Sequence, residues 1–302
     1  MRKSIFEAVA AMSLLFSAGL FAEEISEPDE LKIFRQAYPG ITFECEYDKT
    51  AGDYLIKVGR DENITYLYWQ DGKFLPESEI SDAASYFPIL YRYADEIPDP
   101  ADFDAGQVER IKDFSSTERR RNSSGTPPFL YDAIYDCGSR KALETHIVRT
   151  TFLGKKTTIH ERMLDPLKRV EKRINRLTLK NAEVKNFVDN LASADSYNWR
   201  EIADSKKRSF HSLGIAIDVL PYGWSQKNIY WAWRRDIDKN WMLLPLEKRW
   251  FPPDEVIRIF EEEGFIYGGK WIIWDNMHFE YHPELIIYNG INPGLNLQKN
   301  AD

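Results

Sequence analysis

The sequence is short of several residue types, and each shortage excludes a class of protein. The 302-residue chain has only two cysteines, Cys45 and Cys137. Two cysteines so far apart do not make a zinc knuckle, and their spacing leaves open whether they form a disulfide in an oxidising compartment. The formal net charge is −8. Because nucleic-acid affinity comes mostly from neutralising phosphates, we expect no nucleic-acid partner.

Long hydrophobic runs are also missing beyond the first 22 residues. We therefore expect no membrane span after that point. Residues 1–22 are typical of a signal peptide, with basic Arg2 and Lys3 before an apolar run that ends in small residues. This predicts an exported protein of the periplasm or cell envelope, and an uncleaved anchor is the alternative.

The composition allows a sizeable core, because 43% of the residues are hydrophobic. Residues 23–160 predict an N-terminal β-rich module of unknown role. Its segments "DYLIKV" and "ITYLYW" favour strands, and Asp71-Gly72 favours a tight turn. Residues 112–128 are polar and rich in Ser, Arg and Pro, which predicts a loop.

Residues 161–295 predict a second, α+β domain. Apolar residues recur at helical spacing from Leu164 to Leu177, and the spacing continues through Val184 to Leu191. The segment "PPDEVIRIFEEEG" predicts a further helix that ends near Gly264. The tryptophan-rich segment 222–250 could form a lid or the wall of a groove.

Histidine is scarce, and its placement is informative. The five histidines are His146, His160, His211, His278 and His282. His146 and His160 have ordinary neighbours and are expected to be surface or core residues. In "SFHSLGIAID", Asp218 falls on the same strand face as Ala216, and Gly214 allows a bend that returns His211 toward that face. The pair is either two zinc ligands or a His–Asp hydrogen bond in the core.

A second cluster, "DNMHFEYHPE", spans residues 275–284. Phe279, Tyr281, Ile286, Ile287 and Tyr288 favour a strand over a helix. On a strand, His278, Glu280 and His282 share a face, and Asp275 lies in the preceding turn. His211, Asp218 and His278 then supply three zinc ligands and leave the fourth position open for water. Asp275 is the candidate general base, with Trp271 and Trp274 as an apolar wall that raises its pKa.

Two motifs carry a resemblance to a known family. Ser209, His211, Gly214, Ala216 and Asp218 complete the pattern S-x-H-x-x-G-x-A-x-D, and "GFIYGGKWIIWDNMHFE" resembles the family's second motif. The family is the zinc D-alanyl-D-alanine carboxypeptidases and L-alanyl-D-glutamate endopeptidases, which cut peptidoglycan peptides. The resemblance covers about residues 165–290. It implies a hedgehog/DD-peptidase-like α+β fold, with an antiparallel sheet and flanking helices.

The resemblance also implies roles for individual residues. His211, Asp218 and His278 would bind Zn²⁺, and Asp275 would be the catalytic base. An aspartate there is more similar to the L-Ala-D-Glu endopeptidase branch than to the vancomycin-resistance dipeptidases, which have a glutamate. "YNWREI" resembles a segment in which Arg200 would bind a substrate carboxylate or carbonyl. Ser209 and Glu280 would support the ligands through hydrogen bonds.

Three functions remain open from the sequence. The leading hypothesis is an exported zinc metallopeptidase acting on peptidoglycan stem peptides. The others are a non-catalytic zinc-containing binding protein of the cell envelope and a metal-free structural protein. His282 is either a group that helps bind substrate or stabilise an oxyanion, or a residue at the rim.

Overall fold

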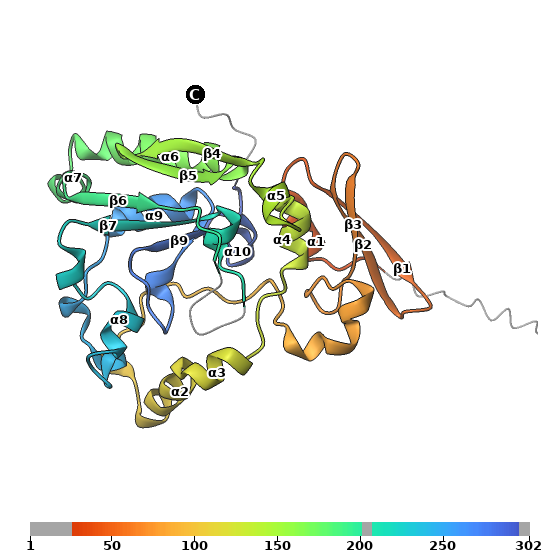
Figure 1. Ribbon diagram of the computed structural model, residues 1–302, viewed down its shortest axis with the longest axis horizontal. Helices are drawn as coiled ribbons and strands as arrows, with labels where there is room; N and C mark the ends of the chain where they lie inside the picture. The colour runs from red at the N-terminus through yellow and green to blue at the C-terminus, as the bar shows by residue number, and fades with distance from the viewer. Residues whose placement is uncertain (1–25, 201–206, 296–302) are drawn as a thin grey trace, which may run out of the picture.

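The computed structural model describes residues 26–200 and 207–295 and has a mixed α+β architecture. Figure 1 shows a small β-sheet on the right, formed by the N-terminal part, and a larger sheet on the left with helices beside it. The sheets are antiparallel, as expected. The predicted signal, residues 1–22, lies outside the described residues. Among those described, no helix combines the length and apolar character that a bilayer crossing requires.

The N-terminal part is β-rich, as predicted. After helix α1 (Leu31–Ala37), three strands form an antiparallel meander: β1 (Thr42–Asp48), β2 (Asp53–Arg60) and β3 (Asn63–Tyr68). "DYLIKV" and "ITYLYW" supply β2 and β3. Asp71 and Gly72 have positive φ, so they form the predicted turn, although the ladder beyond it is a single bridge between Tyr68 and Leu75. Cys45 on β1 and Cys137 are both free.

The predicted loop at residues 112–128 is wrong, because most of it is helical. Helix α2 (Ala105–Ser115) starts at a capping box of Asp104 and Gln107, and the side chain of Ser116 caps α3 (Thr117–Asn122). Some of the polar residues that suggested a loop are therefore caps of helices, and most of the others lie on the surface. Helices α4 (Phe129–Tyr135) and α5 (Arg140–Leu143) then lead to a hairpin of β4 (Ile147–Phe152) and β5 (Lys155–His160).

The continuous helical spacing after residue 164 belongs to two helices. Helix α6 (Glu161–Thr178) carries the predicted apolar face, and α7 (Ala182–Asp189) begins after a break. Asn181 makes the break, since its side chain accepts hydrogen bonds from the backbone N–H groups of Glu183 and Val184. Leu191, which the periodicity placed on the helix, instead begins a strand.

Four strands form the central sheet in the order β6-β7-β9-β8. They are β6 (Leu191–Asp195), β7 (Ala216–Pro221), β8 (Phe265–Tyr267) and β9 (His278–Tyr281). The predicted helix at 254–262 is α9 (Asp254–Glu262), and Gly264 follows it at φ +99°. The strand preference of Ile286, Ile287 and Tyr288 is overruled, because Pro283 opens helix α10 (Pro283–Tyr288).

The tryptophan-rich segment contributes to a second apolar core. Helix α8 (Trp231–Arg235) buries Trp231 against Trp241 and Trp274, with Ile111 of α2. Trp224 and Trp233 remain exposed. The main core includes Phe34 and Ile56 from the N-terminal part together with Phe260 and Phe279. A division of the chain near residue 160 therefore stays a prediction.

Candidate metal centre

A short capped helix places His211. The Ser209 side chain accepts from the His211 backbone N–H at 3.3 Å and starts a 3₁₀ turn, Phe210–Leu213. Gly214 ends the turn at φ +70°, where a Cβ would lie 2.7 Å from the backbone nitrogen of His160. A side chain would therefore be both strained and crowded at residue 214. His211 is buried, and its Nδ1 lies 2.8 Å from the carbonyl oxygen of Ser196.

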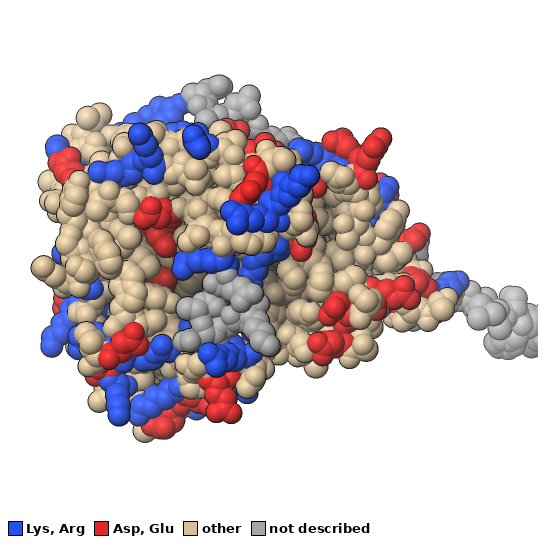
Figure 2. Space-filling view, viewed as in Figure 1, with Lys and Arg blue, Asp and Glu red and all other residues tan. Residues whose placement is uncertain are grey.

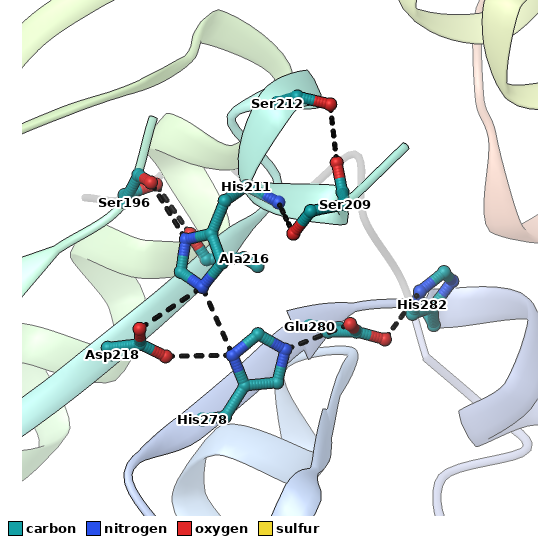
Figure 3. Close-up of polar contacts among 9 residues, drawn as sticks. All are labelled: Ser196, Ser209, His211, Ser212, Ala216, Asp218, His278, Glu280 and His282. Atoms are coloured by element: carbon teal, nitrogen blue, oxygen red, sulfur yellow. Dashed lines mark hydrogen bonds and ion pairs between the residues drawn. The ribbon is translucent and has the colours of Figure 1, made fainter. Parts of the chain in front are cut away.

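Strand pairing brings Asp218 and His278 together. The two residues are direct partners in the antiparallel β7–β9 ladder, and partners of this kind have side chains on the same face. Asp218 Oδ1 lies 2.8 Å from His278 Nδ1, and Oδ2 lies 3.2 Å from His211 Nε2 (Figure 3). Burial acts to raise the pKa of Asp218, but the charges and hydrogen bonds of the two histidines outweigh it and lower the pKa.

Glu280 fixes the other side of the His278 ring. Glu280 Oε1 lies 2.9 Å from His278 Nε2, two residues along the same strand (Figure 3). Burial raises the pKa of Glu280, but hydrogen bonds to His278 and His282 prevail and bring it to about 2. Glu280 is therefore an anionic acceptor for a proton on His278 Nε2.

The donor atoms fit a metal ion such as zinc. A carbonyl oxygen can only accept, so His211 carries its proton on Nδ1 and presents a lone pair at Nε2. That nitrogen lies 3.2 Å from His278 Nδ1, and both nitrogens face the Asp218 carboxylate. Two nitrogens at about 2.05 Å from zinc and at tetrahedral angles lie about 3.4 Å apart. The ligand atoms of His211, Asp218 and His278 all lie within 4.8 Å of one another. Without a cation, one imidazole must take up a second proton.

Asp275 lies in the turn before β9, as predicted. Its backbone N–H donates to the carbonyl of Gly268 at 3.0 Å, and a Cβ on Gly268 would lie 2.7 Å from the Asp275 carbonyl oxygen. Its Oδ1 is buried and finds no hydrogen-bond partner among the described residues. Burial, opposed by the charge of His278, raises the pKa of Asp275 to about 7. Trp274, one of the two residues proposed as its apolar wall, directly precedes Asp275 in the chain and is buried.

Arg200 is not one of the three residues whose ligand atoms meet at the centre. Its side chain is exposed, and its carbonyl accepts from the backbone N–H of Ser209 at 3.3 Å. Burial and the charge of Asp275 raise the pKa of Tyr230, and the positive charge of Arg200 acts in the opposite direction. Tyr230 in turn forms a β-bridge with Asp275. Residues 201 and 202 of the "YNWREI" segment lie outside the described residues.

The structure also adds partners that the sequence did not predict. His211 is oriented by the backbone carbonyl of Ser196, which leaves no side-chain signal in the sequence. His282 is buried behind Glu280 rather than at a rim, and its Nε2 lies 3.3 Å from Glu280 Oε2 (Figure 3). Its Nδ1 lies 2.8 Å from Glu284 Oε1. Burial lowers the pKa of His282, but these two carboxylates outweigh it and raise the pKa to about 9.

The surface around the centre is not uniformly acidic, despite the net charge. In Figure 2, basic and acidic side chains lie together around α2 and α3, whereas acidic ones predominate over the N-terminal sheet. Arg120 of α3 lies over the ring of Trp231 at 5.0 Å, and Arg235 lies over the same ring at 4.9 Å. One member of the basic run at residues 119–121, Arg120, is therefore packed on an aromatic ring.

Comparison with known proteins agrees with the chemistry of the centre. A family model described as D-alanyl-D-alanine carboxypeptidase matches residues 203–281, which include His211, Asp218, Asp275 and His278. A domain of unknown function matches residues 30–91. No curated protein and no solved structure gave a match. The first match covers less than half of the chain, and it supports a peptidase of this family for the part that holds the candidate centre.

Proposed function

We propose that this protein is an exported zinc metallopeptidase that hydrolyses peptidoglycan stem peptides. The observation that carries the proposal is the meeting of His211 Nε2, His278 Nδ1 and the Asp218 carboxylate, three electron-pair donors at hydrogen-bond distances. His211, Asp218 and His278 would be the ligands. The family match at residues 203–281 supports the peptide substrate, and the signal-like residues 1–22 support export.

Zinc bound to these ligands would polarise the scissile carbonyl and make water a better nucleophile. The chain supplies the remaining groups. Asp275 is a suitable general base, because its Oδ1 has no other described partner and its pKa of about 7 suits proton transfer near neutral pH. Glu280 would hold His278 in the tautomer that leaves Nδ1 free.

Arg200 would bind a carboxylate or carbonyl of the substrate, since its exposed side chain lies on the segment that leads into Ser209. The bond that is cut is either D-Ala-D-Ala at the peptide terminus or L-Ala-D-Glu within it. We favour the second, because the base is an aspartate.

The direct test is digestion of purified peptidoglycan by the zinc-loaded protein, followed by mass spectrometry of the new peptide ends. We expect the wild type to release one type of end, which identifies the bond. The variant Asp275→Asn should lose about 100-fold to 10,000-fold in rate, the usual contribution of a general base. Its zinc content should not change, because Asp275 is not among the three ligands.

A matched control is Asp189→Asn. Asp189 ends helix α7, and its exposed side chain pairs with Lys185 on the same helix, so its loss should leave the rate unchanged. If the wild type and Asp275→Asn both bind zinc and neither releases peptide, the protein is a zinc-containing binding protein and the peptidase proposal is wrong.

A further inference from the structure

A buried row of polar side chains continues from the metal centre to the N-terminal part of the chain. It starts at His278 and passes through Glu280, His282 and Glu284. Successive side-chain atoms lie 2.9, 3.3 and 2.8 Å apart. Each side chain is at most 11% exposed.

Glu284 is the far end of this row and is fully buried. A carboxylate without water needs hydrogen-bond donors from the protein. Glu284 receives them from three places: the His282 ring at 2.8 Å, the Tyr131 hydroxyl at 2.8 Å and the Tyr38 hydroxyl at 2.5 Å. Tyr131 belongs to α4, and Tyr38 directly follows α1.

Tyr38 lies inside the region that matches the domain of unknown function. Its neighbour Gln36 on α1 donates to the carbonyl of Pro293, which follows α10. Burial and the charge of Glu284 raise the pKa of Tyr38 well above its usual value, so its hydroxyl stays a donor. The N-terminal helix therefore contributes a donor to a carboxylate that no solvent reaches.

The consequence for the metal centre follows from the order of the contacts. If Glu284 loses the Tyr38 hydrogen bond, its charge is less well balanced and it can shift toward His282. His282 is shared between Glu284 and Glu280, so such a shift changes how Glu280 holds the His278 ring. Outer groups of this kind set the orientation and basicity of a metal-ligating histidine.

We propose that Tyr38 is a positioning residue for the metal centre, which acts on His278 through Glu284, His282 and Glu280. The N-terminal part would then be an integral part of the centre and not only an appended module. This inference rests on the proposed zinc centre.

The test is the zinc affinity of the full-length Tyr38→Phe variant, measured by competition with a chromophoric chelator. We expect zinc to bind about 3-fold to 10-fold more weakly than to the wild type, less than the 10–100-fold of a group that contacts the ligand directly. The visible spectrum of the cobalt-substituted protein should also change, because it reports the arrangement of the ligands.

Tyr93→Phe is the matched control. Tyr93 is also buried, and its hydroxyl donates to the buried Glu261 at 2.6 Å, joining the N-terminal part to α9. It also accepts from the backbone N–H of Tyr267 at 2.8 Å, so its loss should destabilise the fold at least as much. Among the described residues, the hydrogen bonds of Tyr93 do not include the row from His278 to Glu284. The zinc affinity and cobalt spectrum of Tyr93→Phe should therefore stay those of the wild type.

Equal zinc affinities for wild type, Tyr38→Phe and Tyr93→Phe would overturn the inference, and so would equal weakening in both variants, which would indicate a general loss of stability. If Tyr38→Phe does not fold, Tyr131→Phe serves in its place, because it removes the second hydroxyl from Glu284. A wild-type protein that binds no zinc would instead overturn the proposed function.

Discussion

Two pairs of histidines in this protein differ in how their ring nitrogens are satisfied. His160 is buried, yet its Nε2 donates to the carbonyl of Tyr135 at 3.1 Å and its Nδ1 accepts from the backbone N–H of Arg162 at 3.1 Å. Its neighbour His146 meets Glu161 at 3.0 Å. In the other pair, the outer nitrogens of His211 and His278 meet the Ser196 carbonyl and Glu280. Their inner nitrogens lie 3.2 Å apart, and both face the Asp218 carboxylate. A core histidine has a hydrogen-bond partner in the protein for each ring nitrogen, whereas histidines of a candidate metal site turn nitrogens toward one another. This difference separates the two pairs better than the number of histidines nearby.

The largest test of this comparison removes one ring from each pair. His211→Ala should weaken zinc binding by more than about 100-fold, since even groups outside the ligand shell account for 10–100-fold. His160→Asn should keep about one equivalent of zinc, because its ring is satisfied by the protein alone. Zinc content after dialysis against a weak chelator gives both values. Comparable zinc loss in both variants would remove the distinction.

The second test uses pH. Burial lowers the pKa of His160 to about 4, whereas the unfolded chain has a histidine pKa of about 6.5. Above about pH 6.5, His160 is neutral in both the folded and the unfolded state, and its contribution to the free energy of unfolding is fully present. As the pH falls below that value, the unfolded state binds the proton first. The free energy of unfolding therefore decreases until the folded state also binds the proton, at about pH 4. The titratable groups close enough to affect the pKa of His160 are His146, Arg162 and Glu161.

We expect His160 to account for a loss of about 2–3 kcal/mol between about pH 7.5 and pH 4.5. Urea unfolding of the wild type and of His160→Asn at the two pH values isolates this contribution from the other groups that titrate. The difference between the two proteins should shrink as the pH falls. A difference that stays constant would mean that His160 is not held neutral in the fold.

The third test acts on the residue between the two pairs. Gly214 accepts from the backbone N–H of His160 and directly follows the turn that holds His211. Gly214→Ala should lower the free energy of unfolding by about 2 kcal/mol, because positive φ and crowding add. Gly223→Ala is the matched control: it has φ +67° but open space around it, so it should cost about 1 kcal/mol. Urea unfolding compares them, and equal losses would show that the close approach at Gly214 is unimportant.

The smallest expected effect comes from Ser209. Ser209→Ala removes the acceptor for the His211 backbone N–H, and such a cap contributes about 0.5–2 kcal/mol to stability. Zinc affinity should fall only a few-fold, because Ser196 still holds the ring. Paired urea and zinc titrations measure both. A zinc loss as large as that of His211→Ala would place Ser209 in a more direct role than the structure gives it.

The sequence predicted the parts of the site that depend on local pattern. The alternation after Gly214 predicted that Asp218 faces the centre, and the aromatic residues around His278 predicted a strand. Local pattern failed at residues 283–288, where Pro283 and packing produce a helix, and at residues 179–181, where Asn181 interrupts a continuous periodicity. It also failed at 112–128, where Ser116 caps helix α3 in a segment that resembles a loop.

What the sequence by itself determined is the local geometry around the candidate ligands, because a histidine, glycine and aspartate at fixed local spacing constrain a turn and the strand after it. What only the tertiary structure decided is which groups from other segments form hydrogen bonds with those residues and their neighbours. The Ser196 carbonyl on His211 and the hydroxyls of Tyr38 and Tyr131 on Glu284 come from segments far away in the chain. Their contacts depend on strand pairing and on the burial of a shared core, and no short-range pattern encodes either.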